Sequence, residues 1–190
     1  MKRKFALISL LAIVGGCLSV IGTVCAQTDT AIGSNPHLRA QSAPTQSAQS
    51  IAVKLSDKDR KFIQGAANGG VAEVADGKVA EEDGQSAEVK KIGARMVADH
   101  SKANNELVEL AKKKGLSIDT SKGKSRNFDK ARFDRQYLVS MEKDHETDIK
   151  VFEKEASSGD DADIKRWASK TLPTLKEHLA MIDNALKKMK

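Results

Sequence analysis

The chain has 190 residues, with 32 lysines and arginines, 26 aspartates and glutamates, two cysteines and seven aromatic residues. That length allows one ordinary domain and argues against a multidomain assembly. With 39% hydrophobic and 31% charged residues, the composition is that of a globular, helical protein rather than a disordered one. The net charge of +6 would suit nucleic-acid binding, depending on where the basic residues lie.

The N-terminal segment, residues 1–26, is typical of an export signal. The basic residues KRK at positions 2–4 precede a nearly unbroken apolar run over residues 5–14. The tripeptide VCA at 24–26 supplies the small residues that a signal peptidase reads, so cleavage is expected before Gln27. We therefore expect an exported protein of the periplasm or cell envelope.

Two other fates of this segment remain open. Residues 5–26 are long enough to span a bilayer as an uncleaved anchor. The sequence VGGC at 14–17 resembles a bacterial lipobox, which predicts lipidation of Cys17. The apolar stretch continues beyond Cys17, and this favours ordinary cleavage.

Removal of the signal changes the charge and the thiol content. The segment carries three basic residues, no acidic residue and both cysteines, so the mature chain has a net charge of +3 and no cysteine. A disulfide scaffold and a thiol catalyst are thereby excluded. The remaining charge is too small to suggest nucleic acid as a partner.

A flexible linker is predicted over residues 27–55. This stretch is rich in Gln, Ser, Ala and Thr, contains Pro36 and Pro44, and has no apolar period. It cannot bury enough apolar surface to offset the entropy lost on ordering. As a flexible chain it would reach about 30 Å.

Residues 56–190 are predicted to form an all-α four-helix bundle. Apolar residues recur at spacings of three and four, and no segment shows the period-two alternation of a strand. Serine or aspartate caps most of the helix starts and glycine ends three of the helices. The expected helices are residues 56–84, 86–115, 127–159, and 160 or 161 to the C-terminus.

The lengths of the connections limit the topology. Short links at Gly84 and Gly159 predict two antiparallel hairpins. The middle connection, residues 116–126, reaches about 40 Å when extended. It is long enough for the crossover of a ferritin-like fold, and an up-down-up-down bundle also remains open. Pro173 lies inside the fourth helix and is expected to kink it.

Three histidines and one glutamate are the candidate site. His100, His145 and His178 lie on different predicted helices, and each follows an acidic residue. Counted from the helix starts, these histidines and Glu73 fall within about 10 Å along the bundle axis. Bundles build metal sites by bringing such side chains together mid-core.

We consider two interpretations of this cluster. Buried histidines commonly pack the core and bond to neighbouring carboxylates or backbone groups. Alternatively, the four residues bind Zn, Cu, Fe or Ni, or belong to a haem site, as their ligand types allow. Met96 and Met141 lie on the same faces as soft ligands, although methionine at such positions usually packs the core.

Several motifs resemble an exported bacterial family of unknown function. They are GGVAEV at 69–74, RMVADH at 95–100 with Asn104, and TLPTL at 171–175 with His178. The family is predicted to have a ferritin-like fold and is often labelled as outer-membrane proteins. The resemblance covers residues 56–190 and implies a fold and an envelope location, with no established reaction.

The sequence departs from carboxylate-bridged di-iron bundles, which use two Glu-x-x-His pairs. Here Glu142 and His145 make the single pair, while Val97 and Leu175 occupy the equivalent positions before the other histidines. A ferroxidase is therefore not expected. No catalytic or cofactor-binding residue is singled out, and a metal-dependent redox protein is the catalytic alternative to a non-enzymatic bundle.

Two basic stretches and a pair of glycines are weaker features of the sequence. The basic residues at 112–114 and 122–135 would suit anionic lipid or another polyanion. Acidic residues also lie throughout the chain, so a solvated surface is the favoured explanation. Gly69 and Gly70 predict a close helix contact opposite His100. We therefore expect an exported envelope protein with a metal-binding core cluster, or alternatively a structural, partner-binding or stress-related bundle without metal.

Overall fold

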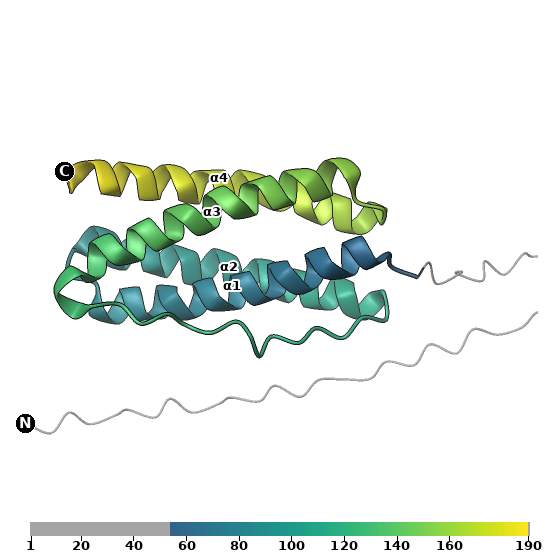
Figure 1. Cartoon of the computed structure of the whole chain (residues 1–190), viewed down its shortest axis with the longest axis horizontal. Helices are drawn as coiled ribbons and strands as arrows, with labels where there is room; N and C mark the ends of the chain where they lie inside the picture. The colour runs from purple at the N-terminus through teal and green to yellow at the C-terminus, as the bar shows by residue number, and fades with distance from the viewer. Residues whose placement is uncertain (1–53, 190) are drawn as a thin grey trace, which may run out of the picture. The chain divides into compact units, whose positions relative to one another are not determined.

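The computed structural model describes residues 54–189. The predicted signal peptide, the possible anchor and lipidation sites and most of the predicted linker lie outside these residues. The described part forms four long helices and one 3-10 turn, which are α1 (Asp57–Asp83), α2 (Ala87–Lys113), η1 (Lys130–Arg132), α3 (Phe133–Ser158) and α4 (Ala162–Lys188) (Figure 1). Between residues 54 and 189 there is no strand, and the predicted all-α four-helix bundle is confirmed.

The helix boundaries follow the predicted caps in three cases. The side chains of Ser56, Ser86 and Asp161 accept hydrogen bonds from backbone N–H groups in the first turns of α1, α2 and α4. The predicted start of the third helix near residue 127 is wrong, because Asp129 caps the separate turn η1 and α3 begins only at Phe133. Helix α4 continues through Pro173 without a break.

The connection between α2 and α3 runs along the length of the bundle (Figure 1). Near its beginning, the Asp119 N–H donates to Gln64 Oε1 at 3.1 Å, close to the start of α1. Further along, the Arg126 N–H donates to Asp76 Oδ1 at 2.7 Å, toward the end of α1. We call residues 114–129 the crossover. It decides between the two topologies left open by the sequence, because α2 and α3 must run in the same direction.

Each hairpin packs against the other through two helix pairs. The α1–α2 and α3–α4 pairs share the largest interfaces, while α2 also contacts α4 and α1 contacts α3. The hairpins are joined at one end by Asp59, which accepts the backbone N–H groups of Asp160 and Asp161, each at 3.0 Å. At the other end Asp134 accepts those of Gln85 and Ser86 at 2.7 and 2.9 Å.

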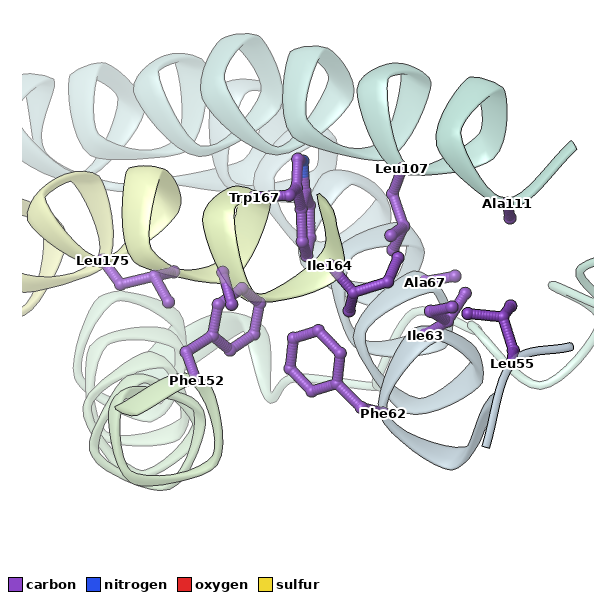
Figure 2. Close-up of a cluster of buried hydrophobic side chains, with 11 residues drawn as sticks. Leu55, Phe62, Ile63, Ala67, Leu107, Ala111, Phe152, Ile164, Trp167 and Leu175 are labelled. Atoms are coloured by element: carbon purple, nitrogen blue, oxygen red, sulfur yellow. The ribbon is translucent and has the colours of Figure 1, made fainter. Parts of the chain in front are cut away.

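The apolar core consists of two clusters. Figure 2 shows the first, in which the Phe62, Phe152 and Trp167 rings meet with centroids 5.0 to 6.1 Å apart. Leu55, the last residue of the predicted linker, is 3% exposed and belongs to this cluster. The second cluster contains Phe133, Tyr137, Leu138, Met141 and Ile182, together with Ala80, Val89, Ile92, Met96, Ala185 and Leu186.

Glycines bring α1 and α2 close together at a place the sequence analysis did not identify. A Cβ atom at Gly77 would lie 2.9 Å from the Gly93 carbonyl oxygen, and one at Gly93 would lie 2.7 Å from the Gly77 oxygen. The predicted close contact at Gly70 is present, but it is made with Asn104 rather than His100. At Gly69 the prediction is wrong, because an added Cβ would meet no atom within 4 Å.

None of the helices in the described part combines the length and the apolar character needed to cross a membrane.

Candidate metal centre

A polar layer separates the two apolar clusters. It consists of Glu73, His100, His145 and His178, one residue from each long helix, with exposed fractions of 2%, 6%, 0% and 0%. On every helix the polar residue follows members of one cluster and precedes members of the other. All four residues predicted as the site therefore come together in the bundle. His178 is fully buried.

The three imidazoles face one another. Their ring centroids are 5.2 to 5.5 Å apart, and His145 Nε2 lies 3.2 Å from His178 Nδ1. One nitrogen from each ring can be chosen so that all three lie within 4.8 Å of one another. Three neutral imidazole nitrogens in this proximity could serve as ligands of one transition-metal ion.

The partners of the outer nitrogens determine which inner nitrogens carry a lone pair. His145 Nδ1 lies 2.9 Å from the Met141 carbonyl oxygen, which can only accept, so Nδ1 bears the proton. His178 Nε2 lies 2.9 Å from Asp99 Oδ2, so Nε2 donates to that carboxylate. In the neutral rings, His145 Nε2 and His178 Nδ1 are therefore both unprotonated.

Two facing lone pairs repel each other, and a cation between them would remove this repulsion. A proton would serve only if one ring were charged, and burial opposes that. Two nitrogens bound at about 2.0–2.1 Å to a tetrahedral metal lie about 3.3 Å apart, and the observed separation is 3.2 Å. The pair is thus spaced as two ligands of one metal ion.

His100 is the third member of the group. Its Nδ1 lies 3.2 Å from Glu73 Oε2, and its buried Nε2 has no hydrogen-bond partner. If Nδ1 donates to the glutamate, Nε2 keeps a free lone pair. An unpartnered buried nitrogen is costly in an apolar core, and a metal ion would provide its partner.

Glu73 lies beneath two of the rings. Its Oε1 is 3.4 Å from His145 Nδ1 and makes no hydrogen bond. Its carboxyl group thus faces the outer nitrogens of His100 and His145, rather than joining the inner group of three. A carboxylate in this place orients ligating histidines, as carboxylates behind metal-bound histidines generally do.

Burial keeps the imidazoles neutral. Burial, with the neighbouring histidines, lowers the pKa of His100 to about 3. Burial and His178 lower the pKa of His145 to about 4. Burial also lowers the pKa of His178, although the hydrogen bond with Asp99 opposes this. The pKa of Glu73 is raised well above its usual value by burial and by the charges of Asp148 and Asp144. Near neutral pH the rings are therefore in the form that binds metal.

Asp99 is the functional residue whose role sequence reasoning missed. It precedes His100 in the chain but its carboxylate binds His178 on α4 and also accepts from Arg95. Burial alone would raise the pKa of Asp99, but the hydrogen bonds from Arg95 and His178 lower it overall. The acid–histidine dipeptides signalled nearby carboxylates, whereas the partner was set by helix packing.

A small cavity of about 20 Å³ touches Glu73 and His100. Its size allows one water molecule or a ligand of similar size beside the cluster. Three protein ligands with a fourth position left for water or substrate is the pattern of catalytic rather than structural metal sites. Met96 and Met141 are fully buried members of the second apolar cluster.

The comparisons with known proteins agree with the resemblance inferred from the motifs. A family described as a domain of unknown function (DUF4142) matches residues 44–185. Searches of the curated proteins and of the solved structures found no significant match. Because the matched region covers most of the chain and the whole polar layer, the protein belongs to the DUF4142 family.

Proposed function

We propose that this protein is an exported cell-envelope bundle that binds one transition-metal ion through His100, His145 and His178. Glu73 and Asp99 hold the rings in the ligating orientation. The observation that carries the proposal is the 3.2 Å approach of two unprotonated nitrogens, together with the unpartnered His100 Nε2 in the same cluster of three rings. In this proposal Glu73 orients the histidine rings, whereas the sequence alone had predicted it as a fourth metal ligand.

Metal ions of intermediate hardness suit a set of three imidazoles best. Neutral imidazole is a ligand of Zn, Cu, Fe and Ni, and the ligand group contains no thiolate. Zinc would keep a tetrahedral geometry with water in the fourth position. A redox metal in the same position would make electron transfer the catalytic alternative.

The export signal and the long crossover support the wider context. The signal-like segment 1–26 supports secretion of the mature domain. The crossover is the connection that distinguishes ferritin-like bundles from up-down-up-down ones, which supports a ferritin-like relationship. Only one of the two Glu-x-x-His pairs of di-iron bundles is present, Glu142 with His145, so the relationship would concern the fold and not the di-iron chemistry.

The rival function is a structural or partner-binding bundle without metal. The hydrogen bonds from His145 to Met141 and from His178 to Asp99 favour it, because they satisfy part of the polar layer within the protein. That arrangement leaves His100 Nε2 unpaired and two lone pairs facing each other. The metal hypothesis explains both features.

Metal analysis separates the two functions. The mature chain, purified without a histidine tag, is stripped with a chelator and titrated with Zn²⁺, Cu²⁺, Ni²⁺ or Co²⁺ by calorimetry. We expect one ion per chain in the wild type and none in a His100→Ala/His145→Ala variant. His37→Ala, which changes a histidine in the predicted linker, is the matched control and should bind as the wild type does.

The opposite results would support the rival. If no metal binds the wild type, or if the double variant binds as well as the wild type, the proposed ligands are wrong. The rival predicts that the double variant loses stability while the metal content of wild type and variant stays the same.

A further inference from the structure

Two cavities beside the polar layer share part of their lining. The inner one, of about 20 Å³, reaches His100. The outer one is a pocket of about 390 Å³ formed by α1, α3 and the crossover. Their linings have two residues in common, Glu73 and Asp148. These two carboxyl groups therefore stand between the outer pocket and the polar layer.

Both carboxyl groups have oxygen atoms free to interact with a passing ligand. Glu73 is 2% exposed and its Oε1 has no hydrogen-bond partner. Within the described residues Asp148 takes part in no side-chain hydrogen bond or ion pair. Asp144 differs from it, because Arg126 Nη2 lies 2.8 Å from Asp144 Oδ2. Asp148 offers a carboxylate, and Glu73 an oxygen without a partner, to a cation at this junction.

We propose that the outer pocket is the entry route of the metal ion, and that a divalent cation passes Asp148 and then Glu73 to reach the three imidazoles. This inference rests on the proposed metal-binding function and adds the path by which the site is filled. Carboxylate oxygens along the path would replace water molecules that the ion loses as it enters the core.

The charges at the rim of the outer pocket predict how rim substitutions should change the rate of metal binding. Arg126 is neutralised by Asp76 and Asp144, at 2.7 and 2.8 Å. Lys124 and the other rim lysines, Lys122 and Lys143, are exposed. A rim lysine should slow the approach of a cation and speed that of an anion.

The opposite side of the bundle offers a less suitable path. A pocket of about 100 Å³ between α2 and α4 contains Glu106 and shares Ala103 and Thr171 with the inner cavity. Asp99 also lines this pocket, but neither Asp99 nor Glu106 lines the inner cavity. Both carboxylates are already paired, Asp99 with Arg95 and His178, and Glu106 with Lys170. Glu106 therefore serves as the control for Asp148, because it is a pocket carboxylate on the side of the cluster away from the proposed route.

Stopped-flow binding of Co²⁺ to the metal-free chain tests the route. In Asp148→Asn we expect the association and dissociation rates both to fall about tenfold, with the affinity unchanged. In Lys124→Ala we expect faster association. In Glu106→Gln both rates should equal those of the wild type.

Several outcomes would overturn the route without affecting the proposed function. These are an unchanged association rate in Asp148→Asn, a slower rate in Glu106→Gln, or slower association in Lys124→Ala. A loss of affinity in Asp148→Asn at an unchanged association rate would make Asp148 a ligand, which also contradicts the proposal. If the wild type binds no Co²⁺ or other metal, the proposed function itself fails.

Discussion

The close approach of α1 and α2 at Gly93 allows a quantitative prediction. In Gly93→Ala the new Cβ would lie 2.7 Å from the Gly77 carbonyl oxygen, 2.8 Å from Ala80 Cβ and 3.1 Å from the Glu81 nitrogen. These atoms belong to the backbone or are fixed to it, so no side-chain rotation can relieve the overlap. The two helices would have to move apart.

The magnitude follows from two opposing effects. Overpacking of this kind costs about 1–3 kcal/mol. Alanine gains about 1 kcal/mol over glycine inside a helix. We therefore expect Gly93→Ala to lower the free energy of unfolding by up to about 2 kcal/mol. Gly65→Ala is the matched control, because its Cβ meets no atom within 4 Å, and it should gain up to about 1 kcal/mol.

Urea unfolding followed by far-UV circular dichroism measures both effects. Gly93→Ala should shift the midpoint to lower urea and Gly65→Ala to higher urea, with similar slopes. A Gly93→Ala midpoint equal to or above that of the wild type would refute the reasoning. It would show that the helices can separate at no net cost.

Three further predictions concern other parts of the bundle. Burial and Asp59 raise the pKa of Glu155 from 4.5 to about 7, so the folded state binds the Glu155 proton more tightly and stability falls as the pH rises from 4.5 to 7. Over this range the wild type should lose about 1–2 kcal/mol of unfolding free energy relative to Glu155→Gln. Parallel curves of unfolding free energy against pH for the two proteins would contradict this. Asp76→Ala removes a fully buried carboxylate that accepts hydrogen bonds from the backbone N–H and the Nε of Arg126 at 2.7 and 2.8 Å. Urea unfolding should therefore show a loss of about 2–4 kcal/mol in the free energy of unfolding. A loss below about 1 kcal/mol would mean that Asp76 does not hold the crossover in place. Metal at about 100 times its Kd should raise the unfolding free energy of the wild type by about 2.7 kcal/mol in thermal melts, and an equal rise in His145→Ala would exclude His145 as a ligand.

The candidate site was largely predictable because helix geometry converts sequence position into height. Glu73 and the three histidines each lie about half-way along a helix of 26 or 27 residues. At 1.5 Å per residue, antiparallel hairpins bring mid-helix residues to one level. The prediction needed only the helix starts and the apolar faces.

The hydrogen-bond partners of the site were not predictable in the same way. Asp99 and His178 are far apart in sequence, and their contact depends on how α2 and α4 are rotated toward each other. The Gly77–Gly93 approach and the Asp148 junction likewise arise where two helices meet. The position of a residue in the sequence fixes its height along its own helix. It says little about which face a neighbouring helix turns toward that residue.

By itself, the sequence therefore determined the class, the helices and the level of the polar layer, since capping and apolar period are local properties of the chain. It also located half of the excess charge and both cysteines in the export-like segment, leaving a mildly basic and thiol-free remainder. Only the tertiary structure chose the crossover topology and turned the imidazoles toward one another. Those choices depend on contacts between helices, whose free energies are distributed over residues far apart in the sequence.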